Sequence, residues 1–282
     1  MAARGGGCGG GGAHRRPAPR PRPRQPGAAR CPLRPRDPLP AADREQGDPL
    51  TRFLALAEKE TRALFASPIA YAVIAVFLLL NGYTFAVTLF LTKQATLAHI
   101  FFQAAVQLIL LVPLVTMRQF AEERRGGTLE LLLTAPVHEA EIVLAKFAAS
   151  MLLLLAMIAG TLVYALILGR FGAPDWGPVY SGYLGLLLLG AALVAIGLAV
   201  SALASNQIVA AVVSLGLFGL LWAIDSWAAV LPAPADNWVL GLSLLARFTP
   251  FAVGAMYLSD FGFFLVLALL GLFLTVRALV RR

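Results

Sequence analysis

One short connection in this sequence, residues 120–136, combines five ionised side chains with a glycine pair and a run of leucines ("FAEERRGGTLELLLTAP"). Leucines offer apolar area that a partner can bury, and charges of both signs at the rim can fix the register of a contact. Catalytic residues are not gathered in this way. His14, His99 and His138 are isolated from one another along the chain and form no metal-ligand spacing, so no metal is predicted. The residues alone fit two interpretations equally, recognition of another protein and contact of the charges with lipid headgroups.

The composition around this connection is that of a chain in a lipid bilayer. Hydrophobic residues make up 59% of it and charged residues 13%, whereas soluble domains have roughly 45–50% apolar and about 25% charged residues. Six hydrophobic segments follow one another, each of about 20 residues, the length that crosses a roughly 30 Å hydrocarbon core. We expect them at 69–91, 99–117, 141–168, 180–203, 207–231 and 260–277. The predicted fold is an all-α membrane protein with six transmembrane helices.

Residues 1–48 differ from the rest, being rich in Gly, Pro and Arg and almost free of apolar side chains. Burial cannot offset the entropy of ordering such a segment, so we predict disorder. This tail has ten arginines and four carboxylates, which give it +6 of the net charge of +8. Residues 49–282 therefore carry only +2, and no nucleic-acid partner is predicted for them. A basic arm that touches anionic lipid or RNA, and a mis-assigned start codon, are the alternatives. The first apolar run begins only near Ile69, so no signal peptide is apparent.

Two further segments connect with the spans. Residues 48–68 ("DPLTRFLALAEKETRALFASP") intersperse apolar and charged side chains, which predicts an amphipathic helix on the membrane surface that ends near Ser67-Pro68. The connection 232–259 is too long for a turn and still apolar. Short helices at the outer surface, or partly re-entrant ones, are expected there, because backbone groups near lipid must be satisfied within the protein.

The basic residues indicate how the chain is oriented. Six crossings place both termini on one side, and cytoplasmic connections carry the excess of Lys and Arg. With the amino terminus inside, ten basic residues beyond the tail are cytoplasmic and three are not. The ten are Arg52, Lys59, Arg62, Arg118, Arg124, Arg125, Lys146, Arg277, Arg281 and Arg282, and the three are Lys93, Arg170 and Arg247. We therefore predict a multi-pass protein of a bacterial plasma membrane, with both termini and the connection 120–136 in the cytoplasm.

Within that connection, the second span is expected to continue as a polar helix to Arg125 and to end at Gly126-Gly127, because glycine readily adopts the left-handed conformation that closes a helix. Thr128 suits the N-cap of a new short helix, and Pro136 ends that helix before the third span. A short, exposed helix on the cytoplasmic face follows. The alternative is that these charges only reach the lipid headgroups.

The stretch "FAEERRGGTLELLLTAPVHEAEIVLAKF" resembles the connection between the second and third spans in permeases of the ABC type 2 superfamily, which is close to E-x-x-x-G-T-x-E-x-L-L-x-x-P-V followed by I-V-x-x-K. The matching positions are Glu123, Gly127, Thr128, Glu130, Leu132, Leu133, Pro136, Val137, Ile142, Val143 and Lys146. Stretches 55–85, 204–214 and 247–264 support the resemblance. Within the superfamily, the sequence is most similar to the gliding-motility and copper-processing branch (GldF and NosY type). One departure is that Phe248, Phe251 and Gly254 lie among apolar residues, so no substrate is inferred from the outer region.

The resemblance implies that the short helix is a coupling helix, which docks in a groove of a separate ATP-hydrolysing subunit. The coupling residues would be Glu122, Glu123, Arg124, Gly126, Gly127, Thr128, Glu130, Leu132, Leu133 and Pro136. No P-loop motif is present, so no catalytic residue or cofactor is expected on this chain, and ATP and Mg would be bound by the partner. The implied partners are an ABC ATPase dimer, a second permease copy or a homologous permease, a periplasmic auxiliary subunit, and membrane lipid.

Other polar residues have two interpretations each. Asn206 and Gln207 either cap helices or form a second cytoplasmic face toward the ATPase. Gln103 and Gln107, one turn apart, either form interhelical hydrogen bonds or line a translocation path, and Asp225 is a further candidate for that path.

Small residues at Gly197, Ser201 and Ser205 predict close helix packing. Of the ionisable residues, only Asp225 is expected well within a span, and Lys146 near its cytoplasmic edge. This scarcity argues against an ion-coupled secondary transporter. That transporter class and a membrane scaffold of a motility or maturation apparatus remain the alternatives to an ABC permease.

Overall fold

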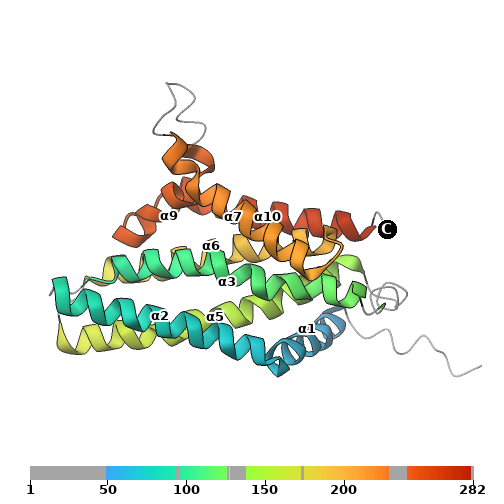
Figure 1. Ribbon diagram of the computed structural model, residues 1–282, viewed down its shortest axis with the longest axis horizontal. Helices are drawn as coiled ribbons and strands as arrows, with labels where there is room; N and C mark the ends of the chain where they lie inside the picture. Colours follow the sequence, from blue (N-terminus) through green and yellow to red (C-terminus); the bar gives the residue numbers. More distant parts are fainter. Residues whose placement is uncertain are drawn as a thin grey trace, which may run out of the picture. The chain divides into compact units, whose positions relative to one another are not determined.

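Helices form almost the whole of the computed structural model, which describes residues 49–92, 96–125, 127, 138–172, 175–228 and 240–280 (Figure 1). The helices are α1 (Pro49–Ala66), α2 (Pro68–Thr92), α3 (Ala98–Arg125), α5 (Glu139–Phe171), α6 (Trp176–Leu203), α7 (Gln207–Ala228), α9 (Leu244–Val253) and α10 (Leu258–Val280). The described residues contain no strand. The tail 1–48, predicted to be disordered, lies outside them.

Within these ranges, six helices are long and apolar enough to cross a membrane. Their apolar parts are Pro68–Leu91, Ala98–Ala121, Glu139–Phe171, Trp176–Leu203, Gln207–Trp227 and Leu258–Val280. Each corresponds to one of the six segments expected from hydropathy. The prediction of an all-α membrane protein with six such helices is therefore confirmed, as is the polar continuation of the second span to Arg125.

The amphipathic helix predicted before the first span is α1, which ends at Ala66 and is separated from α2 only by Ser67. One face of α1 carries Leu56 and Leu64, which pack against the buried core, whereas Leu54 is 62% exposed. Helix α1 contacts α5 and α2. The helix is thus held by the bundle along one side, and its place on the membrane surface stays a prediction.

Helix α6 forms the centre of the bundle, since it contacts α3, α5, α7, α9 and α10. Of its most apolar stretch, 67% is buried inside the protein, against 17% for α7. Small residues make this position possible, because glycine and alanine let neighbouring backbones approach closely. Figure 1 shows α3 running beside α6, as their contacts require.

The approach of α3 to α6 follows the small-residue spacing seen in the sequence. A Cβ on Gly197 would lie 2.4 Å from the Thr116 hydroxyl oxygen. One turn further on, Ser201 Oγ donates to the Met117 carbonyl oxygen (3.2 Å) and accepts from the backbone N–H of Phe120 (3.3 Å). Packing is therefore the role of Gly197 and Ser201, whereas Ser205 is exposed in the bend that follows α6.

Gly271 lies where α10 packs closely on the α6 backbone, and its substitution gives a direct test of that packing. A Cβ at this position would lie 2.6 Å from the Ala195 carbonyl carbon and 2.7 Å from the Ile196 nitrogen, and backbone atoms cannot move aside cheaply. We expect Gly271→Ala to lower the free energy of unfolding by about 1–3 kcal/mol, the usual cost of overpacking. The midpoint of heat-induced unfolding in detergent is the measurement. Gly262→Ala is the matched control on the same helix, since its Cβ meets nothing within 4 Å, and equal midpoints for both variants would contradict the prediction.

The connection 232–259 contains the short helix α9, as expected, and residues 240–242 are also helical. The α9 helix is docked into the bundle rather than lying only on its surface, because Phe248 and Phe251 are 0% and 1% exposed. Ser181 Oγ on α6 donates to the Phe251 carbonyl oxygen over 2.8 Å. Contacts to α3, α6, α7 and α10 surround α9. Phe248 and Phe251 are thus core residues, whereas the apolar neighbours Val253 and Met256 are exposed.

Candidate functional site

The stems of the predicted coupling loop are the end of α3 at Arg125 and the start of α5 at Glu139. Gly127 has φ +68°, the left-handed conformation that was expected to close the α3 helix. Glu122 and Arg124 lie on the final turns of α3. The remaining predicted coupling residues, Gly126, Thr128, Glu130, Leu132, Leu133 and Pro136, lie outside the described residues.

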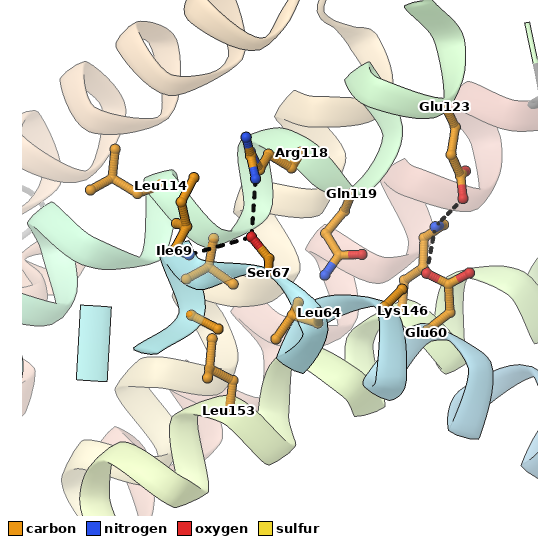
Figure 2. Close-up of a pocket in the computed structure, with 13 residues that line it drawn as sticks. Glu60, Leu64, Ser67, Ile69, Leu114, Arg118, Gln119, Glu123, Lys146 and Leu153 are labelled. Atoms are coloured by element: carbon orange, nitrogen blue, oxygen red, sulfur yellow. Dashed lines mark hydrogen bonds and ion pairs between the residues drawn. The ribbon is translucent and has the colours of Figure 1, made fainter. Parts of the chain in front are cut away.

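A buried lysine joins the two stems to α1 (Figure 2). Lys146 Nζ lies 2.6 Å from Glu123 Oε1 and 2.9 Å from Glu60 Oε2. The Lys146 side chain is 1% exposed, and its ammonium lies 5.3 Å from the centre of the Phe120 ring. Burial of an isolated cation costs several kcal/mol, and two carboxylates and an aromatic face offset that cost here. We call Glu60, Glu123 and Lys146 the ion-pair triad.

The helix geometry explains why Lys146 is buried. Lys146 shares the inner face of α5 with Ile142, Ala149 and Leu153, which are all buried, because positions three, four and seven apart lie on one side of a helix. A second polar contact lies one turn along α5. Ser150 Oγ donates to the Lys146 carbonyl oxygen (3.0 Å) and accepts from Gln119 Nε2 on α3 (3.0 Å). The α3 and α5 stems are thus held together over two turns.

Of the triad, Glu123 was predicted as a coupling residue, and Lys146 matched the family pattern, but Glu60 was not singled out. Its neighbours Glu58, Lys59 and Arg62 suggested an exposed polar face. The signal that could have found it is its position four residues from both Leu56 and Leu64. A carboxylate that interrupts the apolar stripe of an amphipathic helix faces the protein and requires a cation there.

The second predicted cytoplasmic face lies in the turn between α6 and α7. Asn206 is exposed, and its side-chain oxygen accepts from the backbone N–H of Val209 over 2.8 Å, so it caps α7. Gln207 is the first residue of that helix. The capping role of Asn206 is confirmed, and contact of this turn with an ATPase stays a prediction.

Gln107, one of the two candidate pathway glutamines, forms an interhelical hydrogen bond. Its Oε1 accepts from Asn81 Nδ2 of α2 over 2.7 Å, and the same nitrogen donates to the Phe77 carbonyl oxygen over 2.8 Å. Asn81 and Gln107 are 0% and 3% exposed. This amide pair links α2 to α3 within the bundle. The sequence analysis did not identify Asn81 as the partner of Gln107.

Gln103 has a different environment. It lines an open cavity of about 500 Å³ together with His99 and Trp222, between the carboxyl end of α2, the start of α3 and α7. Asp225 lies one turn beyond Trp222 on α7, is partly buried, and does not line this cavity. The structure therefore does not bring the three predicted pathway residues to one site.

A second buried carboxylate lies at the end of the bundle away from the ion-pair triad, at the edge of the last span rather than well within it. Asp260, in the first turn of α10, is 4% exposed, and its Oδ1 lies 2.6 Å from Arg247 Nη1. The Arg247 guanidinium also lies 5.6 Å from the centre of the Phe263 ring. Asp260 was taken as the boundary of the last span. Helix α9 brings the cation that allows it to be buried.

The arrangement described so far is a six-span helical bundle with a polar loop stem after the second span. Residues 113–279 match the family model described as ABC-2 family transporter protein, which covers the chain from the middle of α3 to the end of α10. No curated protein matches the chain. Since the match extends over more than half of the sequence and includes the loop, this chain belongs to the ABC-2 family of transporter proteins.

Proposed function

We propose that this chain is the permease subunit of an ATP-driven exporter, in which a separate ATPase subunit binds and hydrolyses ATP with Mg. Membership of the ABC-2 family and six helices able to span a membrane support the permease assignment. The absence of a P-loop in the sequence supports the division of labour between two chains. The excess of Lys and Arg in the connections expected inside supports a cytoplasmic location of the loop and both termini, and we propose a bacterial plasma membrane.

The ion-pair triad is the observation that carries the coupling proposal. Glu123 lies two residues before the end of α3, and Lys146 lies two turns after the start of α5, so the two flank the loop on either side. Glu60 on α1 forms an ion pair with the same lysine. A displacement of the loop is therefore transmitted to three helices together, rather than being absorbed by one stem that slides past the other.

The mechanism follows from this connection. Binding of ATP closes the ATPase subunits, and the loop helix at 128–135 moves with the groove that holds it. The triad passes that motion to α1, α3 and α5, and two permease copies, or this chain and a homologous one, rearrange to release substrate. The exposed cavity at Gln103 lies at the far end of α3 from the triad, so we propose it as part of the outer exit.

The test is whether this chain changes the activity of a nucleotide-hydrolysing subunit. The full chain is purified in mild detergent with the subunits that accompany it and is reconstituted into vesicles. We expect an ABC ATPase to co-purify, and its rate of ATP hydrolysis to rise when a transported compound is added. Absence of any nucleotide-hydrolysing companion would overturn the proposal. A bound ATPase whose rate responds to no compound, in a complex that moves none, would indicate a scaffold of a motility or maturation apparatus instead.

A further inference from the structure

A pocket of about 210 Å³ opens where α1 meets α2, α3 and α5 (Figure 2). Its walls are mainly apolar, with Ile69 from α2, Leu114 and Val115 from α3, and Leu153 from α5. Arg118 and the ion-pair triad also line it, and the Glu60 and Glu123 carboxylates there are paired with Lys146. A mostly apolar concavity with a few convergent polar groups is the usual form of a ligand site.

The Arg118 guanidinium is the polar group of this pocket that lacks a matching charge. Its Nη1 donates to Ser67 Oγ over 3.2 Å, and its Nε is buried without a hydrogen-bond partner. Among the described residues, no carboxylate lies within 4.0 Å of Arg118, whereas Lys146 in the same pocket has two. Arg118 therefore carries a charge that no neighbouring carboxylate balances, and its terminal nitrogens are suited to receive an anion.

The depth of the pocket indicates where that anion comes from. Ser67 directly precedes the apolar span Pro68–Leu91, and Arg118 lies in the last turn of the apolar span Ala98–Ala121. Both residues are thus expected at the boundary between the hydrocarbon core and the headgroups. Ser67 also stands at the start of α2, where its Oγ accepts from the backbone N–H of Ile69 (3.4 Å). The positive end of that helix adds to the attraction of Arg118 for an anion.

We propose that this pocket binds a membrane phospholipid, with its phosphate on Arg118 and Ser67. The planar guanidinium fork matches phosphate oxygens, and the terminal nitrogens rather than the buried Nε supply the donors. A volume of about 210 Å³ admits the phosphate and glycerol but not the acyl chains. The chains leave over Leu114, which is 40% exposed, along the apolar surface of α3. The apolar walls favour a lipid over a soluble phosphate compound, and lipid is present at this depth throughout the membrane.

The bound phospholipid would fill the space between α1 and the bundle. Helix α1 is attached on one side through Glu60 and the triad. On the other side of the pocket, the Ser67–Arg118 hydrogen bond attaches the α1–α2 junction to α3. A phosphate that accepts from both residues joins the same two elements, so lipid occupancy would fix the angle at which α1 enters α2.

The experiment titrates the full chain in mild detergent with dioleoylphosphatidylglycerol and follows the bound lipid by native mass spectrometry. Two further probes separate the parts of the ligand: dioleoylglycerol has the chains without phosphate, and glycerol 1-phosphate has the phosphate without chains. We expect the phospholipid to bind at least about tenfold more tightly than either, since a charge-assisted hydrogen bond contributes about 1.5–3 kcal/mol. Equal binding of dioleoylglycerol would overturn the role of Arg118, and equal binding of glycerol 1-phosphate would overturn the lipid as occupant.

Arg118→Gln is expected to weaken phospholipid binding by about tenfold or more. The matched control is Arg170→Gln, which removes an exposed arginine at the other end of α5 and should leave binding unchanged. Ala63→Trp is the second variant, because Ala63 lines the pocket from an exposed position on α1. The indole would occupy the pocket and reduce binding without removing any buried group, so this variant decides the matter if Arg118→Gln fails to fold. Binding like the parent in Ala63→Trp, or equally in both arginine variants, would overturn the proposal.

Discussion

Lys146→Met is expected to lower the free energy of unfolding of this protein by about 3–5 kcal/mol, the cost of removing one partner from a buried ion pair. Methionine fills most of the space of lysine, so the loss is electrostatic rather than a cavity effect. Glu60, which is 7% exposed, and the Glu123 oxygen 2.6 Å from Lys146 Nζ would then lose the cation between them. Two carboxylates that lie on one lysine repel each other once it is removed.

The measurement is the midpoint of heat-induced unfolding in detergent, which should fall by on the order of 10 °C. Lys59→Met is the matched control, since Lys59 is the neighbouring residue of Glu60 and 64% of its side chain is exposed, and it should change the midpoint little. Glu60→Gln, Glu123→Gln and Lys146→Met combined should recover most of the loss, because neutral groups replace the whole set of charges. A single variant as stable as the parent would show that the triad contributes nothing to the fold.

Gly127→Pro is expected to abolish ATP-driven function while leaving membrane insertion intact. Proline fixes φ near −65°, and Gly127 has φ +68°, so the loop cannot keep its direction after α3. The six spans do not depend on this residue. Glu130→Arg should have the same effect by a different route, since it reverses a charge on the proposed docking helix.

Transport and ATPase stimulation in vesicles are the measurements, with insertion checked by the amount of chain recovered from the membrane. Gly127→Asn is the matched control, because asparagine tolerates the left-handed conformation and a Cβ at this position meets nothing within 4 Å. We expect it to retain most of the activity. If Gly127→Pro and Glu130→Arg both behaved like the parent, the coupling role of the loop would be wrong.

The fold was largely predictable because its determinants are local. A run of about 20 apolar residues needs a helix in lipid whatever its neighbours are, so all six spans were found. Their ends were less accurate. Helix α5 begins at Glu139 rather than at 141, since acidic residues in a first turn are favourable for a helix although they are not apolar.

The candidate site was less predictable, because its contacts join residues far apart in the sequence. Glu60 and Lys146 are 86 positions apart, and nothing in either segment alone indicates the other. Gln103 and Gln107 lie one turn apart, and the sequence predicts the same interhelical hydrogen bonding for both. Only Gln107 has Asn81 as its partner in the structure. Asp260 could be recognised as buried only once α9 was known to carry Arg247 back against it.

The length of α5 has a mechanical consequence. Its 33 residues extend for about 50 Å at 1.5 Å per residue, whereas the hydrocarbon core is about 30 Å thick. A rod longer than the layer it crosses must tilt or project beyond it. Lys146 and the loop stem lie near one end of α5 and Arg170 at the other. A displacement of the stem that α5 carries as a rigid rod would therefore reach the opposite face of the membrane.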